Sequence, residues 1–573
     1  MTHLVNDPET FAEEALSGFA DLYRDVVAAV PGGVVRASET PAGKTAVVVG
    51  GGSGHYPAFC GVVGPGLADG AVVGNVFTSP SAHAAVSVGR AAENGGGVLF
   101  ITGNYAGDVM NFDSAARVLR AEGVDARTVY VTDDVASADA DHRDQRRGIA
   151  GDFVVFKIAG SAADAGLGLD EVHRLAVKAN ARTRTMGIGL GGCTMPGAAQ
   201  PLFTVPPGRM GVGLGIHGEP GIADEPLPCA DDVADLLLER VLAEEPVDSV
   251  RRVAAIVNGL GATKYEELFI VWGAVSRRLR ARGFAIVEAE VGELVTSLDM
   301  GGISLTLTYL DEELERWWRA PAYTPAYRKS GRQATPQRPR QTGTRDAERF
   351  VPPATEAACS AGRLALVCLE SMATYLDAAQ ADLGQLDAVA GDGDHGRGMV
   401  KGVKAAVAAA TMATGHGAGI GSVLAWAGEA WAADAGGTSG VLWGRLLGAV
   451  GASLGDERGA ITAEDVAQAL GTGLAAVTET GGASVGDKTM VDALQPFVER
   501  VAAGAAAGES TADAWRAGVE IAQEAARRTS ELTPRRGRAR PLAERSRGHA
   551  DPGATSLALC LAAVAPIIAN GAR

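Results

Sequence analysis

The chain has 573 residues, of which 47% are hydrophobic and 21% charged, the balance of a soluble globular protein with more than one domain. Its formal net charge of −17 argues against a nucleic-acid partner, because phosphate backbones are bound by an excess of Lys and Arg. The six cysteines are scattered without a CxxC pair, so neither structural zinc nor a disulfide framework is expected, and a reducing cytoplasm fits best.

The two ends of the chain carry no expected targeting or membrane segment. The N-terminal stretch MTHLVNDPETFAEE is acidic and lacks an apolar segment, so no signal peptide is expected. The longest apolar run, LALCLAAVAPIIA, contains Pro566 and is too short to span a bilayer. We therefore expect a cytoplasmic protein with no membrane partner.

The sequence pattern of residues 1–330 predicts an α/β domain. Glycine-rich turns alternate there with short β-branched runs, namely TAVVVGGGSGHYP, GAVVGNVF, GGGVLFITGNYAGD, FVVFKIAG and GFAIVEAEVG. Helical stretches such as SPSAHAAVSVGRAAE lie between these runs. Continuous apolar strands followed by helices are typical of a parallel sheet that is covered on both faces.

Residues 331–354 predict a linker, and residues 355–573 predict an all-α domain. The segment 328–353 is basic, poor in aliphatic residues and interrupted by Pro and Gly, which is the composition of a solvated connection. After it the β-branched runs disappear, and Ala/Leu-rich stretches such as MVKGVKAAVAAATMA predict helices joined by glycine-rich loops.

Three loops of the first domain carry polar side chains where strands end. They contain His55, then Asn104, Tyr105 and Asp108, and finally His217. Ligands of open α/β sheets bind beyond the carboxyl ends of the strands, so two histidines and an aspartate are expected to converge on one small ligand. Each loop alone is equally compatible with a hydrogen-bonded structural histidine or a tight turn.

Two glycine patterns resemble the dinucleotide-binding spacing GxGxxG without its context. GLGIHG, from Gly213 to Gly218, is followed by Pro220, Pro226 and Pro228, which prevent a helix from beginning there. GDGDHG would direct two carboxylates at a pyrophosphate. Neither pattern predicts a nicotinamide enzyme.

In the second domain, LDAVAGDGDHGRGM places Asp387, Asp392 and Asp394 close together between glycines. Three neighbouring carboxylates repel one another unless a cation is present, and hard oxygen ligands favour Mg²⁺ with phosphate oxygens of a substrate. GGASVGDKT is not a Walker A loop, because Asp487 separates Gly486 from Lys488. Helix N-termini after the glycine loops are nevertheless suited to bind phosphate.

A basic run follows these loops. It would usually be a solvated face, but between LTP and DPGATS it could instead close over the phosphates of a nucleotide. Its members are Arg535, Arg536, Arg538, Arg540, Arg545 and Arg547. Metal-neutralised phosphates, an acceptor hydroxyl and a base together point to phosphoryl transfer.

The motifs LVNDPETFAEEALSGF, GGGSGH, SPS, NYAGD, GIHGEPG and TSLDMGGISLTLTYLDEEL resemble the substrate-binding K domain of dihydroxyacetone kinases. GDGDHG, GGTSG, GDKTMVDAL and GRAR…ERSRGHADPGATS resemble the nucleotide-binding L domain. The resemblance covers nearly the whole chain apart from the linker. It implies two α/β subdomains followed by an antiparallel helical barrel, a homodimer formed through the K domain, and ATP as co-substrate.

The resemblance also implies roles for individual residues. His217 would add to the substrate ketone as a covalent hemiaminal, which distinguishes a ketose from glycerol. Asp108 and His55 would take the acid–base roles. The other expected substrate contacts are Gly52, Ser53, Gly54 and Gly103. The expected ligands of two Mg²⁺ ions are Asp387, Asp392 and Asp394. The positions that match nucleotide contacts are His395, Gly396, Arg397, Gly398, Thr438, Ser439, Gly481, Met490, Arg538, Asp551, Pro552 and Gly553.

Several positions depart from the family pattern. Family members usually carry Lys where this chain has Gly103, and Glu where it has Tyr56, while GRASYLGERS is replaced by GRARPLAERS. The glycine would open a volume beside the substrate that the extra hydroxymethyl group of a four-carbon ketose fills, with Tyr56 supplying a hydroxyl contact. We therefore expect phosphorylation of erythrulose on its C1 hydroxyl, with dihydroxyacetone as the alternative.

Other relatives of the K domain leave different functions open. Some act as binding or co-regulatory subunits, and some receive phosphate from a protein phosphocarrier rather than from ATP. Both arrangements normally use separate subunits, whereas here the two domains are fused. A lyase activity on flavin dinucleotide with Mn²⁺ is a more distant alternative.

Overall fold

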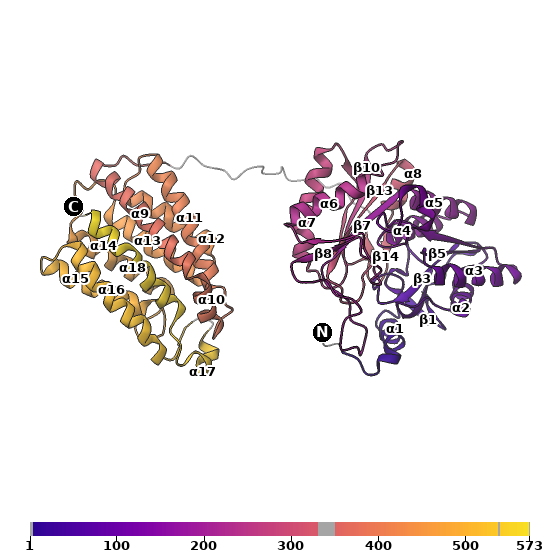
Figure 1. Cartoon of the computed structure of the whole chain (residues 1–573), viewed down its shortest axis with the longest axis horizontal. Helices are drawn as coiled ribbons and strands as arrows, with labels where there is room; N and C mark the ends of the chain where they lie inside the picture. Colours follow the sequence, from indigo (N-terminus) through magenta and orange to yellow (C-terminus); the bar gives the residue numbers. More distant parts are fainter. Residues whose placement is uncertain (1–3, 331–349, 537–538, 572–573) are drawn as a thin grey trace. The chain divides into compact units, whose positions relative to one another are not determined.

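The computed structural model describes residues 4–330, 350–536 and 539–571. The chain divides into two compact units, Met1–Gln337 and Arg338–Arg573, coloured indigo to magenta and orange to yellow in Figure 1. Each unit has a hydrophobic core of its own. Most of the predicted linker, 331–354, falls outside the described residues, so its bounds stay a prediction.

Unit 1 begins with a six-stranded sheet in the order β1-β2-β4-β3-β5-β6. Its strands are β1 (Val27–Val30), β2 (Gly33–Arg36), β3 (Ala46–Ser53), β4 (Gly70–Val76), β5 (Val98–Gly103) and β6 (Ala126–Val131). The pairs β4–β3, β3–β5 and β5–β6 are parallel, whereas β1 and β2 extend the sheet as an antiparallel hairpin. The predicted parallel arrangement thus applies to four strands.

Five helices accompany this sheet: α1 (Phe11–Leu22), α2 (Ala82–Ala92), α3 (Ala106–Ala121), α4 (Gly151–Asp164) and α5 (Leu169–Ala181). The sequence FVVFKIAG, predicted as a strand, forms part of α4. Every residue of α4 from Gly151 to Ala163 is buried, because this helix contacts strands of both sheets of unit 1. A helix that is buried all round has no polar face, so its sequence lacks the helical period.

The second sheet of unit 1 has the order β11-β10-β13-β7-β8-β9, with β12 also paired to β10. Its strands are β7 (Thr183–Gly189), β8 (Arg209–Val212), β9 (Ala223–Pro226), β10 (Arg252–Gly259), β11 (Ala285–Ile286), β12 (Glu290–Gly292) and β13 (Gly302–Tyr309). All pairings along β10-β13-β7-β8-β9 are antiparallel, so the expectation of one parallel sheet is wrong for this half.

Helices α6 (Ala230–Leu242) and α7 (Tyr265–Ala281) pack on one face of this second sheet through a shared apolar cluster. Unit 1 ends with α8 (Glu312–Trp318) and a short hairpin of β14 (Ala322–Tyr323) and β15 (Arg328–Lys329). As the proline pattern predicted, the residues after GLGIHG form strand β9 rather than a helix.

Unit 2 consists of helices, with no strand among its described residues. They are α9 (Glu356–Ala378), α10 (Gln380–Ala388), α11 (His395–Gly415), α12 (Ile420–Ala435), α13 (Gly437–Leu454), α14 (Ala463–Gly481), α15 (Val491–Ala506), α16 (Thr511–Arg528), α17 (Ala543–Ser546) and α18 (Pro552–Gly571). Contacts run from α9 through α11 to α16, then to α18 and back to α9, which closes a helical barrel.

Side-chain caps fix where several of these helices begin. Thr355 accepts the backbone N–H of Ala358 at the start of α9, and Ser510 accepts that of Asp513 at the start of α16. Such caps satisfy N–H groups that have no partner within the helix.

Helix α18 is longer than its apolar run suggested. Over Pro552–Asn570 it is long and apolar enough to cross a membrane by length and composition, but 44% of that stretch is buried inside the structure. It packs against α9 and α16, so it serves as a wall of the barrel core.

Candidate active site

The predicted substrate site lies where loops of the two sheets of unit 1 meet. His55 follows β3, and His217 lies in the connection between β8 and β9. Their Nε2 atoms are 2.9 Å apart. Asp108, in the first turn of α3, is close enough to His217 for the imidazole to influence its pKa. The structure therefore brings together the three side chains that the sequence assigned to one ligand.

The hydrogen bonds of His55 determine its proton positions. Its Nδ1 lies 2.7 Å from the backbone oxygen of Thr296, and because a carbonyl oxygen only accepts, Nδ1 carries the proton. Burial, reinforced by the neighbouring His217, lowers the pKa of His55 to about 3. His55 is therefore neutral, and its Nε2 offers a lone pair to His217.

His217 is held from its other side by Glu219. Its Nδ1 lies 3.0 Å from one carboxylate oxygen, and its backbone N–H donates to the other at 3.0 Å. Burial alone would raise the pKa of Glu219, but the hydrogen bond and charge of His217 outweigh it and lower that pKa to about 2. Both ring nitrogens of His217 thus face acceptors, Glu219 on one side and His55 on the other.

Aromatic rings enclose the His217 imidazole. The centroid of its ring lies 4.8 Å from His55, 5.2 Å from Phe77 and 4.8 Å from Tyr105, each nearly perpendicular to it. Phe77 and Leu298 both adopt positive φ, at 54° and 51°, which is strained for side chains of this size. The strained positions bring the side chains of Phe77 and Leu298 together beside Gly54, the residue before His55.

The glycines before His55 are required by close packing. A Cβ on Gly52 would lie 2.6 Å from the backbone nitrogen of Thr78, and Gly54 has a φ of +99°. Between them, the hydroxyl of Ser53 is buried without a hydrogen-bond partner in the described part of the chain. A substrate hydroxyl would satisfy it.

Asp108 carries a carboxyl group that titrates close to neutrality. Ser79 donates a hydrogen bond of 2.9 Å to its Oδ1. Burial raises the pKa of Asp108 to about 6, and the Ser79 hydrogen bond and His217 oppose that rise. A carboxylate with such a pKa is suited to accept a proton at neutral pH.

The expectation that Gly103 leaves an open volume beside the substrate is wrong. A Cβ on Gly103 would lie 2.9 Å from the ring of Tyr105 and 3.3 Å from the backbone oxygen of Gly148. The hydroxyl of Tyr105 donates to that same oxygen at 2.9 Å, which anchors the ring. Tyr105 therefore fills the space that the glycine vacates, and Gly103 supports the aromatic wall rather than a cavity.

Two other side chains lie away from the expected contacts. Tyr56 is 47% exposed, and its ring packs edge-on against Phe19 at 6.0 Å, so its orientation does not support a hydroxyl contact with the substrate. Asn104 donates its amide to the backbone oxygens of Asp144 and Arg146. It holds the neighbouring segment in place.

In unit 2, the three predicted metal-ligating aspartates lie together. Asp387 is near the end of α10, and Asp392 and Asp394 lie in the loop before α11. One carboxylate oxygen from each can be chosen so that all three lie within 4.8 Å of one another. Oδ2 of Asp387 is buried and has no hydrogen-bond partner among the described residues. An unpaired buried oxygen beside two further carboxylates fits a hard divalent cation such as Mg²⁺.

Three glycine-flanked helix N-termini are linked through His395, the first residue of α11. Its Nε2 lies 2.9 Å from Oγ of Ser556 on α18, and its Nδ1 lies 3.4 Å from Oγ of Ser439 on α13. Gly396 packs against the backbone of Gln380 so tightly that a Cβ there would lie 2.0 Å from its oxygen. The N–H groups at these termini suit an anion next to the aspartate cluster.

Several of the remaining nucleotide-contact predictions lie at these termini, and one lies outside the described residues. Asp551 caps α18 by accepting the N–H of Ala554 at 2.7 Å, and burial raises its pKa to about 7. Met490 is buried beside Gly553. Arg538 lies outside the described residues. Arg397 and Gly398 lie in the first turn of α11, Thr438 in the first turn of α13, and Pro552 begins α18, whereas Gly481 is the last residue of α14.

Several groups that hydrogen-bond to the predicted site residues were not themselves predicted from the sequence. Ser79 and Glu219 stand inside the quoted motifs SPS and GIHGEPG, so the signal was present but was read only as family resemblance. Thr296 acts through its backbone oxygen, for which the residue type gives no signal.

Both parts of the chain match known protein families. Residues 17–326 match the Dak1 domain, and residues 389–566 match the DAK2 domain. A D-erythrulose kinase of Mycolicibacterium smegmatis is 57% identical over 573 residues, which cover 99% of each chain. An L-erythrulose 1-kinase of the same organism is 50% identical over 570 residues, covering 98% of this chain and 99% of the relative.

Among solved structures, the dihydroxyacetone kinase of C. freundii in complex with AMP-PNP and Mg²⁺ is 30% identical, with a TM-score of 0.59 over 99% of each chain. Half of this chain matches the Dak1 domain, and the relatives above align along its whole length with both domains. The protein therefore belongs to the dihydroxyacetone kinase family, as a phosphotransferase that takes an alcohol group as acceptor.

Proposed function

We propose that the protein is an ATP-dependent ketose kinase that binds the substrate carbonyl on His217 and phosphorylates a terminal hydroxyl. The observation that carries this proposal is the arrangement of His217 between an ionised Glu219 and a neutral His55. Erythrulose, phosphorylated on its C1 hydroxyl, is the preferred substrate, and dihydroxyacetone is the alternative. Since Tyr105 fills the space beside Gly103, support for erythrulose comes from the two erythrulose-kinase relatives.

The histidine pair supplies the proton transfers for capture of the carbonyl. The proton on Nε2 of His217 moves to the lone pair of His55, 2.9 Å away. The freed lone pair of His217 attacks the ketone carbon, and the carbonyl oxygen takes the proton back from His55. The proton on Nδ1 of His217, which faces Glu219, stays on the ring throughout, so the ring carries one positive charge before capture and in the adduct, and the carboxylate of Glu219 balances it.

Asp108 is proposed to accept the proton of the substrate hydroxyl during phosphoryl transfer. One of its oxygens is occupied by Ser79, and the carboxylate form dominates above the pKa of about 6.

The phosphoryl donor is ATP, supported by the AMP-PNP and Mg²⁺ complex of the C. freundii relative. Asp387, Asp392 and Asp394 would hold Mg²⁺, two ions being the expectation from the family, and the metal would neutralise phosphate charge.

The role of Asp108 predicts a pH dependence. Below about pH 6 this carboxyl is protonated and cannot accept a proton, so kcat should fall as pH falls through that value. The Ser79 hydrogen bond opposes the rise in the pKa of Asp108. Ser79→Ala should therefore shift the acidic limb of the kcat–pH profile to higher pH by about one unit, which corresponds to the loss of one hydrogen bond to a charged group. Ser81 is the second serine of the SPS motif and caps the N-terminus of α2. Ser81→Ala should leave the acidic limb of the kcat–pH profile unchanged. An unmoved limb in Ser79→Ala would contradict the assignment.

The substrate assignment predicts a ranking of ketoses. With ATP and Mg²⁺, kcat/KM should be higher for D- or L-erythrulose than for dihydroxyacetone. A preference of about tenfold or more for dihydroxyacetone, about 1.4 kcal/mol in transition-state stabilisation, would overturn erythrulose as the substrate and leave the kinase assignment intact. Initial rates over a concentration series of each ketose give the comparison, which also settles the stereochemical preference.

Two properties of the whole protein remain predictions. A homodimer formed through the K domain is supported by the family membership of the Dak1 region. A cytoplasmic location is supported by the relatives, which are metabolic kinases.

A further inference from the structure

A run of alternating charges leads from the first sheet of unit 1 to His217. Asp134 follows β6 and is 3% exposed at its side chain. Arg147 contacts its Oδ2 at 3.0 Å through Nε and at 2.8 Å through an NH2 group. The other end of the Arg147 guanidinium lies 3.7 Å from Oε2 of Glu219, the carboxylate that holds His217.

The His217 loop is shaped around this guanidinium. Arg147 also donates to the backbone oxygen of Gly213 at 3.4 Å, so it contacts the loop at two points. A Cβ on Gly215 would lie 2.5 Å from its Nη1 and 2.1 Å from Oε2 of Glu219. Glycine at this position therefore leaves the space in which the guanidinium and the carboxylate meet.

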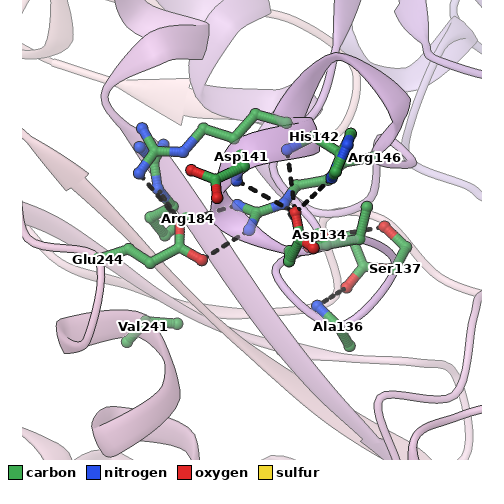
Figure 2. Close-up of polar contacts among 12 residues, drawn as sticks. Asp134, Ala136, Ser137, Asp141, His142, Arg146, Arg184, Val241 and Glu244 are labelled. Atoms are coloured by element: carbon green, nitrogen blue, oxygen red, sulfur yellow. Dashed lines mark hydrogen bonds and ion pairs between the residues drawn. The ribbon is translucent and has the colours of Figure 1, made fainter.

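The segment that carries Arg147 is itself anchored. The neighbouring Arg146 is fully buried and forms a two-pronged pair with Glu244, at 2.9 and 2.6 Å, which Arg184 joins at 3.0 Å (Figure 2). Glu244 follows α6, which packs on the second sheet. The ion pairs of Arg146 and Arg184 with Glu244 fix the position from which Arg147 reaches Glu219, because buried pairs of this kind restrict the chain to one arrangement.

We propose that Arg147 is a positioning residue for capture of the substrate carbonyl and acts through Glu219 on His217. It limits where the carboxylate can lie, and the carboxylate in turn sets the orientation and the charge balance of the imidazole. The inference rests on the proposed adduct at His217. The contacts of the Arg147 side chain are with Asp134, Glu219 and the backbone oxygen of Gly213, so it acts on His217 through Glu219.

A purely structural role makes a different prediction, because Arg147 also compensates the buried charge of Asp134. Removing Arg147 alone leaves that carboxylate uncompensated, which can unfold the unit for reasons unrelated to His217. The comparison is therefore made with Asp134→Asn present throughout, so that removing Arg147 does not leave the Asp134 carboxylate unpaired. Arg147→Gln is added to this background, with and without Glu219→Gln.

The measurement is ¹³C NMR of the whole chain with racemic erythrulose labelled at its carbonyl carbon, which reports conversion of the ketone into the carbon bonded to nitrogen. Arg147→Gln in the Asp134→Asn background should weaken adduct formation by about tenfold or more, as lost outer contacts do at other sites. With Glu219→Gln also present, Arg147→Gln should add almost nothing, since both changes act on one path. Arg277→Gln, which removes an exposed arginine of α7 paired with Asp231 and outside this set of charges, is the matched control.

The outcomes distinguish a positioning role of Arg147 from the adduct at His217 on which it depends. Unchanged adduct formation in Asp134→Asn/Arg147→Gln would mean that Arg147 only neutralises Asp134 and would overturn the inference. An equally large loss with Glu219→Gln present would also overturn it, because Arg147 would then act independently of Glu219. Absence of an adduct in the unmodified chain would refute the proposed function itself. Nucleotide binding by each variant verifies that unit 2 is intact.

Discussion

Asp392→Asn is expected to abolish phosphoryl transfer and leave capture of the ketose by unit 1 intact. Asp387, Asp392 and Asp394 bring three carboxylate oxygens within 4.8 Å of one another, an arrangement that is repulsive unless a cation lies among them. Replacing one carboxylate with a neutral amide weakens binding of that cation and therefore reduces its neutralisation of the phosphate charges. We expect turnover to fall by about a thousandfold or more, the size found when charge stabilisation is lost in phosphoryl transfer.

Two measurements distinguish turnover from ketose capture in this variant. A coupled assay of ADP release follows turnover, and ¹³C NMR of carbonyl-labelled erythrulose follows capture in the same preparation. Asp382→Asn, on the exposed side of α10 and outside the cluster, should behave as the unmodified chain. Ordinary Mg²⁺-dependent turnover in Asp392→Asn would show that this carboxylate is not a metal ligand.

His217→Ala should eliminate the adduct and lower kcat/KM for ketoses by about a hundredfold or more, because the covalent bond holds the acceptor hydroxyl in place. Discrimination between ketoses and glycerol should fall with it, since glycerol has no carbonyl to capture. Binding of ATP, measured by titration calorimetry, should not change, because the positions expected to contact the nucleotide belong to unit 2.

The control for this variant is His142→Ala. This histidine is exposed and bonds only to the neighbouring Asp139 among the contacts described for its ring. A labelled ketose that keeps its ketone signal when bound to the unmodified protein would contradict the covalent role of His217, whatever the kinetics of the variant.

The sequence predicted the features that depend on local composition. The glycine-flanked aspartates marked the cluster of unit 2, because carboxylates so close in sequence cannot lie far apart. The three loops that end strands placed His55, Asp108 and His217 together, since each loop begins at the edge of a sheet. The all-α character of unit 2 followed from the loss of β-branched runs.

The features that the sequence did not predict depend on packing between distant segments. Residues Phe153–Gly160 resemble a strand because α4 is buried by both sheets and needs no polar face. The hollow expected beside Gly103 is filled by Tyr105 two positions later, a question of ring orientation that no motif encodes. Arg147 meets Glu219 because the chain returns to this point after forming α4, α5, β7 and β8.

Assignment of the protein as an ATP-dependent ketose kinase is tested by supplying the purified chain with erythrulose, ATP and Mg²⁺ and identifying the products by NMR. We expect one ADP for each ketose phosphate, with the phosphate on the C1 hydroxyl and no product when Mg²⁺ is removed. ADP formed without a phosphorylated ketose, or a ketose phosphate formed only when a phosphocarrier protein replaces ATP, would contradict it.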